Sequence, residues 1–70
     1  MITRSVVARR LMSGIYVGLR VEVTGEDPTE WPVNDANTDA PFSIIDGVRY
    51  DLTPHERKAI RRAVAEVRQL

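Results

Sequence analysis

The sequence predicts an α+β fold: a small antiparallel sheet of three or four strands, covered on one face by a C-terminal helix, with a long acidic loop. Two observations support this prediction. Residues 15–24 alternate between apolar and polar side chains, which is typical of a strand with one buried face. Residues 54–69 begin with a helix cap and repeat apolar side chains at three- and four-residue steps. The 70 residues are expected to form one domain, 1–70, with a small core.

Residues 1–14 are predicted to form a strand and a turn. A helix through residues 5–12 would scatter the apolar side chains around its axis, whereas a hairpin turning at Ser13-Gly14 collects them on one face. The one mismatch in this hairpin is Arg10, which faces Val17. The predicted register places Met12, Ala8 and Val6 opposite Ile15, Leu19 and Val21.

Residues 25–41 are predicted to form a long loop, because three prolines and five carboxylates interrupt all periodicity. Trp31 is the one large apolar side chain in this segment. In one interpretation Trp31 is a lid over an open end of the core. In the other it is an exposed anchor for a protein partner, since tryptophan is enriched at binding hot spots.

Residues 42–52 allow two interpretations. In the first, they form one continuous strand with a bulge at Gly47. In the second, they form a hairpin that turns at Asp46-Gly47, a dipeptide typical of a type I′ turn. The alternation of apolar residues favours the first and the turn sequence favours the second, so both remain open. The single strand would gather on one face Phe42, Ile44, Val48, Tyr50 and Leu52.

The C-terminal helix is predicted to begin at Pro54. Thr53 and Glu56 have the spacing of a capping box, in which each side chain accepts a hydrogen bond from the backbone amide of the other residue. Pro54 suits the first helical position, where its missing N–H is not needed. One face of this helix is expected to pack on the sheet, and it carries Ile60, Ala63, Val64, Val67 and Leu70.

Charges are segregated along the chain, although the net charge is zero. Residues 1–20 are basic, residues 21–51 are acidic and the last segment is basic again. We expect these blocks to neutralise one another on the folded surface. The zero net charge gives no global attraction to nucleic acid or to an anionic membrane. One flank of the helix nevertheless gathers candidate partner-binding residues, which are Arg57, Arg61 and Arg68.

Alternate oxygen-bearing residues within 35–39 resemble the first half of a calcium-binding loop. Ala40 stands where the tight turn of such a loop requires glycine, and no helix precedes the segment. The alternative is a series of turns stabilised by Asn and Asp side chains. The candidate calcium ligands are Asp35, Asn37, Asp39 and Asp46.

The residues give no catalytic constellation, so we expect a protein that is not an enzyme and that needs no cofactor. His55 is the only histidine, and the chain has no cysteine for a nucleophile, a disulfide or a thiolate metal site. No apolar run approaches the roughly 20 residues that span a bilayer. We therefore expect no membrane partner and a cytoplasmic setting.

The segment 44–54, IIDGVRYDLTP, follows an acidic, proline-rich stretch. Over residues 15–70 this arrangement resembles small phage and prophage proteins of unknown function. The resemblance implies a small non-enzymatic protein that acts inside a bacterial host by binding another macromolecule. The leading hypothesis is an interaction module that binds a protein partner or self-associates through Trp31, an exposed sheet edge or the arginine flank. The alternative is a nucleic-acid-binding accessory protein that uses that flank.

Overall fold

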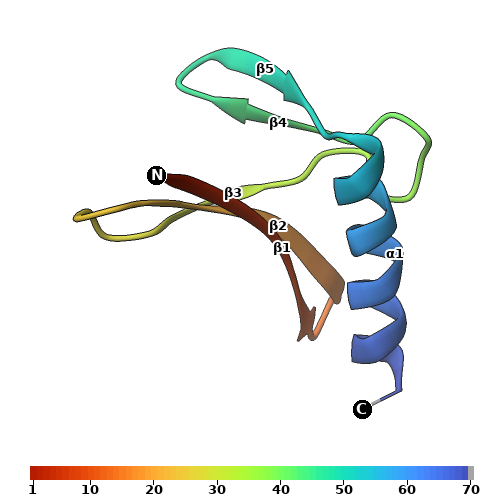
Figure 1. The fold of residues 1–70 in the computed structure, drawn as a ribbon. Coiled ribbons are helices and arrows are strands. Elements are labelled where there is room, and N and C mark those ends of the chain that lie inside the picture. Colours follow the sequence, from red (N-terminus) through yellow and green to blue (C-terminus); the bar gives the residue numbers. More distant parts are fainter. Residues whose placement is uncertain (70) are drawn as a thin grey trace.

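The computed structural model describes residues 1–69 and confirms the predicted α+β class (Figure 1). The strands do not form one sheet, because the first three make an antiparallel sheet in the order β1-β2-β3 and the last two make a separate hairpin. The elements are β1 (Ile2–Leu11), β2 (Gly14–Val23), β3 (Thr29–Pro32), β4 (Phe42–Ile45), β5 (Val48–Asp51) and α1 (Pro54–Arg68).

The β1–β2 hairpin is present, but its register differs from the predicted one by two residues. Leu11 pairs with Gly14, so the connecting residues are Met12 and Ser13 instead of Ser13 and Gly14. Arg10 consequently lies opposite Ile15 and not Val17. Because side chains alternate with a period of two, this shift leaves every side chain on its predicted face.

The prediction of a loop over residues 25–41 was wrong in part, because this segment contains β3. This strand pairs with β2 and places Trp31 opposite Leu19. Proline concealed the strand in the sequence, since Pro28 precedes it and Pro32 is its last residue. Because β3 is an edge strand, it tolerates a proline. Beyond β3, Asn34 forms a bridge with Phe42 through N–O distances of 2.7 and 3.1 Å and so links the two sheets.

The two interpretations of residues 42–52 are resolved in favour of the hairpin. Asp46 and Gly47 have φ angles of 52° and 79°, the left-handed values that a type I′ turn requires. Ile45 pairs with Val48 across this turn. The hairpin projects as an arm from the body of the molecule (Figure 1), and every residue of β5 is exposed.

The predicted capping box is confirmed at the start of α1. The Glu56 amide donates to the Thr53 hydroxyl at 3.2 Å, and the Thr53 amide donates to the Glu56 carboxylate at 2.9 Å. The helix ends at Arg68, with Gln69 as its cap. Leu70, predicted on the apolar face of this helix, lies outside the described residues.

The core lies between α1 and the face of the sheet that carries the odd-numbered residues of β2. Fully burying each large aliphatic side chain here contributes about 1.5–3 kcal/mol. Within the described part of the chain, α1 has neither the length nor the apolar surface needed to cross a bilayer. The buried hydrophobic residues are Val17, Leu19, Leu52, Ile60 and Val67.

Two polar contacts fix α1 along β1. Near the start of the helix, Arg4 Nη2 lies 2.9 Å from Glu56 Oε1, and the Glu56 residue is 8% exposed. Near its end, Arg10 Nη2 donates to the Val67 carbonyl oxygen at 2.9 Å. The helix therefore runs in the same direction as β1 and is held at both ends.

Candidate functional site

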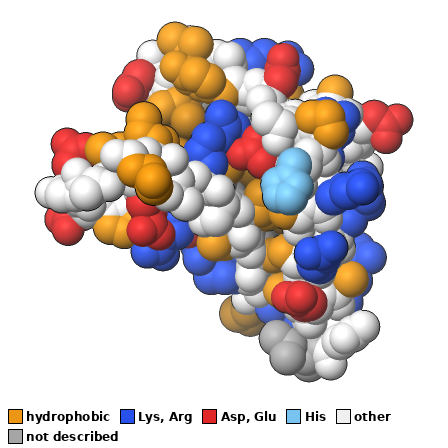
Figure 2. Space-filling view, viewed as in Figure 1, with side chains coloured by type: hydrophobic (Ala, Val, Ile, Leu, Met, Phe, Trp, Pro, Cys, Tyr) orange, Lys and Arg blue, Asp and Glu red, His pale blue; other side chains and the backbone are white. Residues whose placement is uncertain are grey.

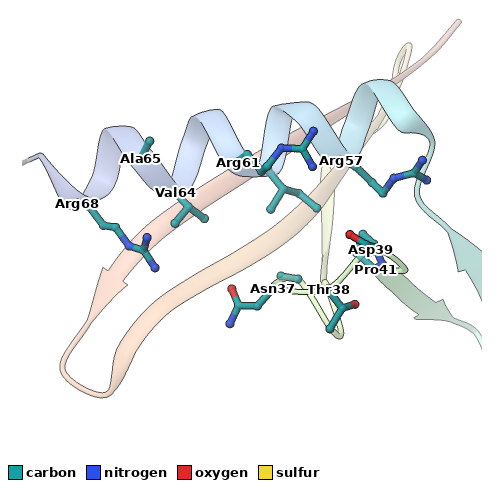
Figure 3. A pocket seen from close by; sticks show the side chains of 11 residues that line it. Asn37, Thr38, Asp39, Pro41, Arg57, Arg61, Val64, Ala65 and Arg68 are labelled. Atoms are coloured by element: carbon teal, nitrogen blue, oxygen red, sulfur yellow. The ribbon is translucent and has the colours of Figure 1, made fainter.

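The three predicted arginines are spread along α1 and line a cleft between this helix and the segment that precedes β4 (Figure 3). We call this cavity of about 400 Å³ the arginine cleft. Arg57, Arg61 and Arg68 line its helical side, where steps of four and seven residues keep them on one flank. Its opposite side is lined by Asn37, Thr38 and Asp39.

The arginines of the cleft differ in how they are held. Arg57 donates from Nη1 to the Leu52 carbonyl oxygen at 3.2 Å, which ties its guanidinium to the end of β5. Among residues 1–69, no acidic side chain forms an ion pair with Arg57, Arg61 or Arg68. Arg61 and Arg68 are exposed. The cleft therefore has two exposed guanidinium groups without an acidic partner in the described structure, and one that is anchored.

A hydrogen-bonded turn forms the wall opposite the arginines. The Thr38 amide and hydroxyl both donate to the Asp35 carbonyl oxygen, at 3.0 and 2.8 Å, and the Ala40 amide donates to the Thr38 hydroxyl at 3.2 Å. Asp35 has a φ of 55°, a left-handed value that aspartate tolerates better than most residues. These bonds set the position of Asn37 and Asp39 at the cleft.

The four candidate calcium ligands are not brought together. Asn37 and Asp39 line the arginine cleft, whereas Asp46 lies in the turn of the β4–β5 hairpin and lines a different cavity. In the part of the chain that the structure describes, no three acidic, histidine or cysteine side chains are placed to hold one metal ion. The hydrogen bonds of this turn come from the Thr38 side chain and the main chain of Asp35 and Ala40.

Trp31 lines the second cavity, an open groove of about 400 Å³ between the sheet and the hairpin arm. We call it the Trp31 groove. The Trp31 side chain is partly buried, and the Trp31 backbone is fixed by pairing with Leu19. Trp31 is therefore a partly buried residue of the sheet that also borders an open groove. Other apolar residues of this groove are Ile2, Val21, Ile45 and Tyr50.

The outer face of the sheet holds a cluster of Arg9, Tyr16 and Glu30. Arg9 forms an ion pair with Glu30, and its guanidinium carbon lies 5.1 Å from the centre of the Tyr16 ring. The Arg9 guanidinium, followed by the Tyr16 hydroxyl, holds the pKa of Glu30 below its ordinary value. Burial, and then the neighbouring Glu30, raises the pKa of Tyr16. Glu30 therefore compensates the positive charge of Arg9 within the sheet.

Gly18 explains how Tyr16 lies flat on this outer face. A Cβ atom at Gly18 would meet the Tyr16 hydroxyl oxygen at 2.8 Å and ring carbons at 2.9 and 3.1 Å. The ring therefore occupies the space that any other side chain would fill. This contact positions Tyr16 beside Arg9.

The sequence placed the arginines on one flank but did not reveal what stands opposite them. Asn37 and Asp39 were assigned to a calcium loop, and Thr38 was assigned no role at the site. No local signal identifies them, because their place beside α1 depends on tertiary packing. Comparison with known proteins finds no matching family model, no matching curated protein and no matching solved structure.

Proposed function

We propose that this protein is a non-enzymatic interaction module that binds an acidic segment of a partner protein in the arginine cleft. The supporting observation is that Arg57, Arg61 and Arg68 all line one concavity and have no ion-pair partner among residues 1–69. Exposed arginines that are scattered need no explanation. Three that line one cavity are suited to bind a common ligand.

The chemistry of the cleft suits carboxylates on a folded or extended peptide. A guanidinium group can donate two parallel hydrogen bonds to one carboxylate, which gives both energy and orientation. The Asn37 amide and the Thr38 hydroxyl offer neutral polar groups on the other side. The floor includes Ile60 and Val64, so an apolar side chain next to the carboxylate would also be accommodated.

Two features favour a protein ligand over nucleic acid. The chain has zero net charge, so it lacks the overall basic character of most proteins that bind nucleic acid. Lys58 and Arg62 do not line the cleft, so the basic residues of α1 are not gathered into one track for phosphates.

The proposal is tested by measuring the binding of a short fluorescent peptide that contains Glu, Asp and Leu. The control probe is the same peptide with Gln in place of Glu and Asn in place of Asp. The double variant Arg61→Gln/Arg68→Gln should bind the acidic peptide at least about tenfold more weakly, the equivalent of about 1.4 kcal/mol. The double variant Lys58→Gln/Arg62→Gln is the matched control, because it removes the same charge from the same helix outside the cleft. Fluorescence anisotropy gives the dissociation constants.

Two results would contradict the proposal. Equal loss of binding in both double variants would indicate attraction to the overall charge of the helix instead of a site. Tighter binding of a single-stranded oligonucleotide than of the acidic peptide, with a steep dependence on salt, would replace the proposal by the nucleic-acid alternative.

The biological setting belongs to the same proposal. We place the module in the cytoplasm of a bacterium that carries a phage or prophage. The support is the absence of cysteine and the resemblance carried by residues 44–54.

A further inference from the structure

The β4–β5 arm has an exposed outer edge. Figure 1 shows β5 on the side of the arm that faces away from the rest of the protein, and β4 on the side toward β3. Hydrophobic side chains gather over the arm in Figure 2. Ile44, Val48 and Tyr50 are 45%, 53% and 44% exposed. An uncovered strand with exposed apolar residues is a surface on which another strand can pair.

The pairing within the hairpin determines which backbone groups of β5 are available. The Leu52 amide donates to the Pro41 carbonyl oxygen at 3.1 Å, which marks these opposite residues as a hydrogen-bonding pair. Hydrogen-bonding pairs alternate in an antiparallel ladder, so Tyr50 and Val48 also bond toward β4. The N–H and C=O groups of Arg49 and Asp51 therefore point away from β4. Within residues 1–69, no other backbone group bonds to them.

We infer that this edge pairs with β5 of a second copy of the same chain. In the proposed antiparallel pairing, Arg49 lies opposite Asp51 of the second copy, and Tyr50 lies on the two-fold axis. The outward N–H and C=O groups of both chains then form hydrogen bonds. In the isolated chain, Arg49 Nε lies 3.0 Å from Asp51 Oδ1 and both side chains are exposed, so this ion pair would be exchanged for two equivalent pairs across the axis.

Charge complementarity favours this register over the two registers that are shifted by two residues. A shift by two residues in one direction places Arg49 opposite Arg49, and a shift in the other direction places Asp51 opposite Asp51. Like charges directly opposite each other are unfavourable in a sheet. A two-fold pairing also uses the same surface on both chains, so the assembly closes as a dimer.

The edge strand β1 lacks this complementarity. It carries Arg4, Arg9 and Arg10 and no acidic residue, so self-pairing would bring positive charges together. Arg4 and Arg9 are also already paired with Glu56 and Glu30. Charged edges of this kind protect a sheet against further pairing. Of these two edges, β5 is the self-complementary one.

This inference extends the interaction-module proposal to a second surface. No residue of β5 lines the arginine cleft, so a dimer would present two clefts to a partner. Two linked clefts would increase the avidity for a partner with repeated acidic segments. Peptide binding and dimerisation can therefore succeed or fail separately.

Analytical ultracentrifugation of the purified chain over a range of concentrations tests the inference. The wild-type protein should show a monomer–dimer equilibrium. Arg49→Glu and Asp51→Arg should each raise the dissociation constant of the dimer at least about tenfold, because symmetry places two like-charge pairs in each variant dimer. An equimolar mixture of the two variants should dimerise again, since opposite charges then face each other at both positions.

Arg62→Glu is the matched control, because it makes the same charge reversal on α1 and should leave the dimer unchanged. Arg49 also lies 4.0 Å from the centre of the Phe42 ring, so far-UV circular dichroism must show that Arg49→Glu is folded. Asp51→Arg retains that contact and gives an independent test. A mixture that remains monomeric, a wild-type chain that is monomeric throughout, or a mass that grows beyond the dimer would overturn the inference. Acidic-peptide binding by the monomeric variants distinguishes this failure from failure of the cleft.

Discussion

The arginines of the strands and the basic residues of the helix lie in two different electrostatic settings. Four strand arginines form ion pairs, and these join Arg4 to Glu56, Arg9 to Glu30, Arg20 to Glu22 and Arg49 to Asp51. In the described part of the chain, no basic residue of α1 has such a partner. The difference indicates that Arg4 and Arg9, whose ion pairs join different elements, mainly serve the fold, whereas the exposed Arg61 and Arg68 have no such role in the described structure.

This difference also refines the expected neutralisation of the charge blocks. The basic N-terminal block is balanced by acids brought to it from other elements, as the pairs of Arg4 and Arg9 show. The basic C-terminal block does not receive the same compensation among residues 1–69. Asp39 approaches it at the arginine cleft without forming an ion pair. Zero net charge therefore conceals a local excess of positive charge on α1.

The largest effect should follow from Glu56→Ala, which removes both the partner of Arg4 and one half of the capping box. We expect the free energy of unfolding to fall by about 2 kcal/mol, since the Arg4 side chain is partly exposed and the pair is only partly buried. Urea unfolding followed by Trp31 fluorescence measures the change. Glu56→Gln keeps an acceptor for the Thr53 amide and should lose less. A Glu56→Ala protein as stable as the wild type would remove the structural role assigned to Arg4.

A smaller effect should distinguish Arg10 from Arg61. Arg10→Met loses the hydrogen bond to the Val67 carbonyl oxygen at the end of α1, which should reduce stability by about 1 kcal/mol. Arg61→Met should stay within about 0.5 kcal/mol of the wild type, because Arg61 is exposed and has no ion pair in the described structure. Parallel urea titrations measure the free energy of unfolding of the two variants and of the wild type. Equal losses would show that the helix arginines also serve the fold.

The smallest effect concerns Glu30 and pH. Arg9 lowers the pKa of Glu30 in the folded protein, so the stabilisation is present above the unfolded pKa and is lost as pH falls through the folded pKa. Thermal unfolding should therefore show a loss of stability below about pH 4.5 that is smaller in Glu30→Gln. Glu26→Gln, in the turn after β2, is the control. Identical pH profiles for wild type and Glu30→Gln would contradict the role of this ion pair.

Features determined by neighbouring residues were the most predictable from sequence. The capping box at Thr53 and the alternation in β2 are both local, and both are confirmed. The Asp46-Gly47 turn was also visible, but the alternation of apolar residues competed with it. The structure shows that the arm is largely exposed, so the distribution of apolar residues between its faces imposes little penalty.

Features that depend on distant residues were not predictable in the same way. β3 is stabilised by pairing with β2 and has prolines next to and within it, so its own sequence resembles a loop. The wall of the arginine cleft could not be predicted either, because Asn37 lies 20 residues before Arg57 in the sequence. The spacing of the arginines predicted a shared flank. Only the packing of the turn against α1 could reveal a concavity beside it.

The two contacts that hold α1 along β1 also constrain the order of folding. They join residues separated by 52 and 57 positions, whereas the β1–β2 hairpin and the capping box are local. We expect local structure to form first, since closing a long loop carries an entropic cost before its contacts are gained. The apolar face of the β1–β2 hairpin, with Val17 and Leu19, would then be exposed until α1 docks. We therefore expect the contacts of Arg4 and Arg10 to form late, and the chain to be most prone to aggregate before they form.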